Sequence, residues 1–155
     1  FFFKQKTAYE IRNCDWSSDV CSSDLEYKED LIGLLKEKNI DFIDCGCDSP
    51  DSVDYPDYAH EVSIKVLDQK NSLGVLICGS ANGVAMAANK HKGIRAAICW
   101  NNKIAELATT HNRANVLCIP ARFISKEEQR NIFDSFINAE FQGGRHTRRV
   151  DKIDC

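Results

Sequence analysis

Several features that would mark a specialised class of protein are scarce in this 155-residue sequence. It has three prolines and eight glycines, which excludes collagen-like and linker-rich chains. It has no apolar run long enough to span a membrane and no basic excess, since the net charge is -3, so we expect no membrane or nucleic-acid partner. With 43% hydrophobic and 28% charged residues, the composition is that of one soluble globular domain.

The eight cysteines include no Cys-x-x-Cys pair, so neither a zinc ribbon nor a thioredoxin-type motif is indicated. Three of them, Cys78, Cys99 and Cys118, end or follow apolar runs, where a thiol is usually a small buried hydrophobe. We therefore expect a reducing, cytoplasmic compartment. Cys45 and Cys47 leave a thiol-redox protein as an alternative.

The first 25 residues differ from the rest of the chain. They begin with three phenylalanines, contain a doubled Ser-Ser-Asp unit and lack both helical and strand periodicity. The order of regions expected of a signal peptide is also missing. The segment resembles translated sequencing-adapter sequence, although a natural N-terminal extension is the alternative. We expect residues 1–25 to be non-native and residues 26–155 to form the domain.

From residue 26 onward, strand and helix patterns alternate. Apolar spacing predicts helices over 26–38, 58–68, 84–89 and 103–111, and a Ser125–Glu128 capping box opens another that runs to about residue 139. Strands are predicted over 41–45, 73–78, 94–99 and 114–119, of which the last three read as buried. This order predicts an α/β fold with a parallel sheet, with ligands bound just after the strand ends at Cys45, Cys78, Cys99 and Ile119.

A turn of small residues follows the most apolar strand, from Gly79 to Gly83. Amide groups at a helix start favour an anion and can stabilise an oxyanion. The same field lowers the pKa of a nearby thiol, which makes Cys78 a candidate base or nucleophile. The turn matches neither the Walker nor the dinucleotide pattern. A tight turn beside a buried thiol is the alternative.

Basic residues gather near the C-terminus. Arg145, Arg148 and Arg149 follow a Gly-Gly hinge, and they could form a phosphate clamp that Arg122 could join, because guanidinium groups bind phosphate in a bidentate fork. A solvated tail is the alternative. His111 ends a predicted helix, where a histidine is more often a surface or capping residue.

Together these motifs resemble those of the ribose-5-phosphate isomerase B family, whose superfamily includes galactose-6-phosphate isomerase subunits. The resemblance covers residues 26–154 in motif order and spacing. The matching motifs are DYPDYA (54–59), CGSANGVAMAANK (78–90), GIRA (93–96), HN (111–112), ANVL (114–117), RF (122–123) and GGRHTRRVDKI (143–153).

The resemblance implies a three-layer α/β/α flavodoxin-like fold and a homodimer or homotetramer with active sites at the subunit interface. It implies isomerisation of ribose 5-phosphate to ribulose 5-phosphate through an enediolate, in the pentose phosphate pathway, without metal or organic cofactor. Galactose-6-phosphate or allose-6-phosphate isomerase is the alternative within the class. A catalytically dead phosphate-binding fragment is the alternative outside it.

The resemblance also implies a role for each site residue. Cys78 would be the base, Ser80 would assist proton transfer at the sugar oxygens, and His111 would help open the furanose ring. The remaining residues would bind substrate: the amides from Gly79 through Asn82 to Gly83 around the oxyanion, Asn112 beside the histidine, Tyr55 at the sugar, and Arg122, Arg145 and Arg149 at the phosphate.

Three departures from the family pattern stand out. Ala81 replaces a glycine, which is inexpensive only if its φ is negative. Arg113 stands where an acidic residue is common. The family's first strand, which ends in an Asp-His pair that contacts the sugar, is replaced by residues 1–25. We therefore expect the sheet to lack its native first strand and to carry an unpaired gap there. As a result, we expect the protein to be less stable and less active.

Overall fold

The computed structural model describes residues 9–14, 21–46 and 54–154. These residues form a parallel sheet of five strands in the order β2-β1-β3-β5-β4. The strands are β1 (Tyr9–Cys14), β2 (Phe42–Asp44), β3 (Leu73–Cys78), β4 (Ala96–Ile98) and β5 (Val116–Pro120). Each connection between parallel strands contains at least one helix, as the alternating pattern predicted.

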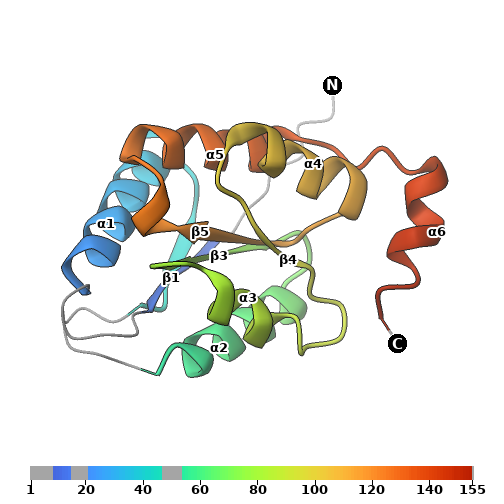
Figure 1. Cartoon of the computed structure of the whole chain (residues 1–155), viewed down its shortest axis with the longest axis horizontal. Coiled ribbons are helices and arrows are strands. Elements are labelled where there is room, and N and C mark those ends of the chain that lie inside the picture. Colours follow the sequence, from blue (N-terminus) through green and yellow to red (C-terminus); the bar gives the residue numbers. More distant parts are fainter. Residues whose placement is uncertain (1–8, 15–20, 47–53, 155) are drawn as a thin grey trace.

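Helices cover both faces of the sheet (Figure 1). On one face lie α1 (Cys21–Glu37), α4 (Asn102–Asn112) and α5 (Lys126–Asn138), and on the other lie α2 (Tyr55–Asp68) and α3 (Asn82–Ala88). The short helices are η1 (Ala121–Phe123), η2 (Gly144–His146) and α6 (Thr147–Val150). The three-layer α/β/α architecture is therefore confirmed.

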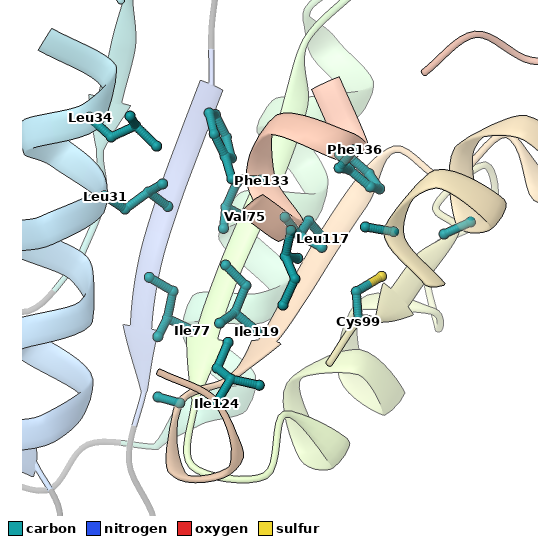
Figure 2. Close-up of a cluster of buried hydrophobic side chains, with 14 of the residues drawn as sticks. Leu31, Leu34, Val75, Ile77, Cys99, Leu117, Ile119, Ile124, Phe133 and Phe136 are labelled. Carbon is teal, nitrogen blue, oxygen red and sulfur yellow. The ribbon is translucent and has the colours of Figure 1, made fainter. Parts of the chain in front are cut away.

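Two hydrophobic cores, one on each face, hold the layers together. Figure 2 shows the core under α1, α4 and α5, where Val75 of β3 lies beside Leu117 of β5 and Ile77 beside Ile119. Phe133 and Phe136 of α5 are at most 1% exposed and close this core. Because β3 and β5 are buried on both faces, nearly all their residues are apolar, and this made them the clearest strands in the sequence.

Helix starts follow local capping signals. The Ser125 hydroxyl accepts a hydrogen bond from the Glu128 N–H at 3.2 Å, and the Glu128 carboxylate accepts one from the Ser125 N–H at 2.7 Å, so the predicted capping box is confirmed. Asn101 caps α4 by accepting from the Ile104 N–H. Helix α1 begins at Cys21, five residues before the predicted start at residue 26, and so extends into the first segment.

The strand predicted over residues 94–99 is present, but it is shorter than predicted, and its predicted burial is wrong. The strand there, β4, comprises three residues, and all three are half-buried. The reason is its place at the edge of the sheet, where only β5 pairs with it. Ile94 and Cys99, just outside β4, are the buried residues of this stretch.

The unpaired gap expected in the sheet is absent, because β1 occupies the position. Tyr9 pairs with both Phe42 and Leu73, and the ladder with β3 continues to Cys14 opposite Cys78. The hydrogen bonds of a ladder join backbone groups, so a strand can form there without the family's sequence. The expectation of a gap is therefore corrected, whereas the replacement of the native sequence stays a prediction.

Candidate functional site

The first group of candidate residues lies at the carboxyl ends of β3 and β5. Cys78 is the last residue of β3, is buried, and lies opposite Pro120 in the sheet. The Arg122 N–H donates to the Gly79 carbonyl at 3.2 Å. A Cβ atom on Gly79 would come within 2.7 Å of the Arg122 Nε, so this guanidinium lies directly over Gly79 and would have to move if a side chain were added there.

Tyr55 joins the same turn from α2. A Cβ atom on Gly83 would lie 2.6 Å from the Tyr55 Cζ, so the phenol ring packs against the first turn of α3. Thus three predicted site residues, Cys78, Arg122 and Tyr55, are brought to one short turn although they are distant in sequence. Cys78 and Arg122 thus lie at two of the four strand ends where ligand binding is predicted, those of β3 and β5.

The middle of the turn is strained. Ala81 is fully buried and has φ +60° and ψ -2°, a left-handed conformation that costs a non-glycine residue about 1–2 kcal/mol. The condition for an inexpensive glycine replacement, a negative φ, is therefore not met. The neighbouring Ser80 is exposed, and its hydroxyl accepts a hydrogen bond of 3.4 Å from the N–H of Asn82, which is also exposed.

The second group lies around the end of α4. The rings of His111 and His146 stack at 4.2 Å between centroids with 10° between planes. Burial lowers the pKa of His146, and the nearby charges of His111, Arg145 and Arg149 lower it further. The tail is attached to α4 by the Gln142 N–H, which donates to the Thr110 carbonyl at 3.0 Å. Asn112 is exposed next to His111.

His146 was not among the predicted site residues. Its sequence signal was its place inside the arginine cluster that follows the Gly-Gly hinge, in the segment GGRHTRR. The stack on His111 shows that this segment lies against the end of α4 rather than forming a solvated tail.

These two groups lie at opposite ends of the parallel strands. The first is at their carboxyl ends and the second is near their amino ends. The Gly74 N–H, near the start of β3, donates to the carbonyl of Asn115, three residues after α4 ends. Cys78 lies four residues further along β3, about 13 Å at 3.3 Å per residue. Figure 1 accordingly shows α6 beyond the end of the sheet, far from α1. One chain alone therefore does not bring Arg145 and Arg149 to Arg122.

An ion pair between a buried lysine and a solvent-accessible aspartate, which the sequence analysis missed, lies at the carboxyl ends of the strands. Lys28 of α1 is 2% exposed, and its ammonium group lies 3.1 Å from the carboxylate of Asp44, the last residue of β2. The other Asp44 oxygen accepts from the Gly46 N–H at 2.9 Å. A lysine within the apolar pattern of the helix was the available signal.

The remaining features considered in the sequence are metal sites, membrane spans and the other cysteines. In the described ranges, no group of three or more histidine, cysteine or acidic residues could hold a metal ion, and no described helix is long and apolar enough to cross a membrane. Burial raises the pKa of Cys99 to about 12, which keeps it a thiol. Cys45 is half-buried, and its predicted redox partner Cys47 lies outside the described residues.

A turn of small residues at the carboxyl ends of the strands, lined by a thiol, an arginine and a tyrosine, places the chain in the class of parallel α/β/α proteins that bind small molecules there. The family model described as Ribose/Galactose Isomerase matches residues 20–153, and the chain belongs to this family. The family resemblance inferred from the sequence motifs is thus confirmed.

Individual relatives agree with this assignment. The chain is 48% identical over 130 residues to a probable ribose-5-phosphate isomerase B of Mycoplasma pneumoniae, covering 83% of this chain and 86% of the relative. It is 38% identical over 126 residues to ribose-5-phosphate isomerase B of Escherichia coli, covering 81% and 85% of the two chains.

Solved structures of such enzymes have the same fold. The crystal structure of a ribose 5-phosphate isomerase from Thermotoga maritima superimposes with a TM-score of 0.88 at 40% identity, covering 96% of this chain and 97% of the other. The ribose-5-phosphate isomerase B of Mycoplasma genitalium with bound ribulose-5-phosphate gives 0.84 at 40% identity, covering 95% of each chain.

Proposed function

We propose that this chain interconverts ribose 5-phosphate and ribulose 5-phosphate, an aldose–ketose isomerisation of the pentose phosphate pathway in the cytoplasm. The observation that carries the proposal is the convergence of Cys78, Arg122 and Tyr55 on the turn after β3. It occurs in a chain similar to a Mycoplasma genitalium isomerase that binds ribulose-5-phosphate. The family likeness supports the same reaction type.

In the proposed mechanism, Cys78 removes the proton from C2 of the open-chain aldose and returns it to C1. The electrons of the broken C–H bond form the enediolate, whose oxyanion the turn amides from Gly79 to Gly83 stabilise. Ser80, exposed within this turn, moves the proton between the two sugar oxygens. Tyr55 lines the sugar, with Asn82 at the start of α3.

Ring opening and most of the phosphate binding are assigned to residues far from Cys78 in the same chain, so the proposed mechanism needs a second copy of the chain. Ring opening by His111, with Asn112 beside it, and phosphate binding by Arg145 and Arg149 are proposed at the opposite edge from Cys78. We propose that two copies pair so that the His111 group of one completes the Cys78 site of the other, where Arg122 adds to the phosphate clamp. Met86 and Trp100, 67% and 54% exposed, are apolar surface that such pairing can cover.

Mixing two inactive variants tests both the function and the shared site. Cys78→Ala and His111→Ala should each isomerise ribose 5-phosphate at least about a hundredfold more slowly, the scale of losing a general acid or base. After joint refolding, half of the dimers are mixed, and one site in each mixed dimer has both residues. About a quarter of the native rate should return, on the assumption that sites act independently. If the mixture isomerises ribose 5-phosphate no faster than the variants alone, the shared site is contradicted.

A second candidate is isomerisation of galactose 6-phosphate or allose 6-phosphate, because the matching family model covers both ribose and galactose isomerases. Comparing kcat/KM for the three sugar phosphates separates these substrates. No turnover of any of them, with phosphate still bound, would instead support the catalytically dead fragment.

We also propose that residues 1–25 are non-native and that residues 26–155 are the isomerase domain. The family model leaves out residues 1–19, although it begins six residues before this boundary, at residue 20. The genomic sequence upstream of residue 26 tests it, since a strand ending in Asp-His is expected there. In this chain Asp15 and Trp16 follow β1 in sequence, so the histidine is missing.

A further inference from the structure

A groove of about 530 Å³ lies at the amino edge of the sheet, away from Cys78. Leu73 at the start of β3, Ile137 of α5 and Phe141 beyond α5 give it an apolar side. Two arginines also line the groove: Arg95, directly before β4, and Arg113, directly after α4. The groove thus combines an apolar surface with two guanidinium groups.

Backbone carbonyls position the Arg95 side chain, and an aromatic ring lies against the Arg113 guanidinium. The Arg95 Nε donates to the Arg113 carbonyl at 2.8 Å, and its Nη1 donates to the Gly93 carbonyl at 3.1 Å. The Arg113 guanidinium lies 5.9 Å from the centre of the Phe141 ring. Within the described part of the chain, neither guanidinium forms an ion pair, and no hydrogen bond uses the Arg95 Nη2.

Two positive charges are therefore held close together and only weakly compensated. Burial lowers the pKa of Arg95, the charge of Arg113 lowers it further, and Asp154 of the tail opposes this effect. Glu140 is the one carboxylate among the groove-lining residues that are described, and it is exposed. A bound anion would relieve the repulsion between the arginines.

We propose that this groove binds a small organic anion, with its carboxylate or phosphate against Arg95 and Arg113 and its apolar body on Leu73, Ile137 and Phe141. The site goes beyond the proposed isomerase function and shares none of its assigned residues. A purely apolar ligand would leave the arginines uncompensated, and a free inorganic anion would leave the apolar side uncovered.

Calorimetric titration of the full chain with benzoate and with phenyl phosphate tests the proposal, and neutral benzamide is the control for charge. Each titration is run with and without saturating ribose 5-phosphate, because phenyl phosphate can also enter the sugar-phosphate site. Benzoate binding that is unaffected by ribose 5-phosphate is expected. Equal binding of benzamide, or no binding of either anion at millimolar concentration, would overturn the proposal.

Three variants locate the binding. Arg113→Asn keeps a residue type that tolerates the φ of 52° at this position and should weaken benzoate binding about tenfold, the loss of one charge-assisted hydrogen bond. Glu140→Gln removes an opposing charge and should tighten binding. Lys36→Gln, on exposed α1 surface, should change nothing.

Benzoate binding that neither Arg113→Asn nor Glu140→Gln changes would place the anion elsewhere. Because the readout is heat of binding, failure of isomerisation would leave this test intact.

Discussion

Strands β1 and β3 lie side by side in the middle of the sheet, yet their sequences differ sharply. They pair residue for residue from Tyr9 opposite Leu73 to Cys14 opposite Cys78. β3 reads LGVLIC, as expected of a strand between two helix layers, whereas β1 reads YEIRNC and contains Glu10 and Arg12. Backbone pairing alone can therefore fill a position in a sheet. The apolar side chains and the reactive groups of this region belong to β3 and not to β1.

The largest expected difference between the strands is catalytic. Both end in a cysteine at the same level of the sheet, but only Cys78 enters the turn covered by Arg122 and Tyr55. Cys78→Ala should lower kcat about a hundredfold or more with little change in KM, and Cys14→Ala should change neither. Steady-state assays with ribose 5-phosphate measure both variants. A comparable loss in Cys14→Ala would remove the distinction between the two strands.

The next difference concerns stability. Leu76 is fully buried, so Leu76→Ala should lower the free energy of unfolding by about 2–5 kcal/mol. Its partner in the ladder is Arg12. Arg12→Ala removes a charge from a strand position between helix layers and should lower that free energy by less than about 0.5 kcal/mol or raise it. Urea unfolding of both variants measures the contrast, and equal losses would show that β1 is packed as well as β3.

A smaller effect is expected at the strained turn after β3. Ala81→Gly should raise the free energy of unfolding by about 1 kcal/mol, because glycine adopts positive φ without strain. The matched control is Ala85→Gly, inside α3, which should lower it by about 1 kcal/mol. Thermal melting distinguishes the two signs. A loss at position 81 would mean that packing of the buried methyl group outweighs the strain.

The smallest expected effect is a pH dependence of stability. His60 and His91 share a contact of 2.7 Å between ring nitrogens, and the pKa of His91 is lowered, chiefly by burial and further by the charge of His60. Below about pH 6.5 the unfolded chain then binds more protons than the folded chain, so stability falls as the pH falls through this value. The lowered pKa of His146 acts in the same direction.

Melting temperatures measured from neutral to mildly acidic pH check this prediction. His91→Gln, which keeps a hydrogen-bonding side chain but cannot titrate, should show a shallower decline. Stability that rises as the pH falls below neutrality would contradict the assigned direction of both pKa shifts.

The sequence predicted the elements whose signals are local. The capping box of α5 and the apolar runs of β3 and β5 each specify structure within a few residues, and all three are present. By contrast, β1 was missed and β4 was predicted as buried, because the pairing and place of a strand depend on segments distant in sequence.

The candidate site was predictable in composition but not in arrangement. The motifs identified Cys78, His111 and Arg145, yet only the topology shows that His111 and Arg145 lie at the opposite edge from Cys78. The positive φ of Ala81 was equally hidden, since backbone conformation at one residue follows from the turn around it. The stack of His146 on His111 depends on where the tail folds back, which no local pattern encodes.

We infer that β1 fills its position in the sheet without supplying the chemistry or the packing of the family's first strand. The direct measurement compares this chain with one in which residues 1–25 are replaced by an apolar strand ending in Asp-His, recording the rate of ribose 5-phosphate isomerisation and the melting temperature of each. We expect a faster rate and a higher melting temperature for the chain with the replaced segment. Equal rates and equal melting temperatures would show instead that residues 1–25 are a working part of the protein.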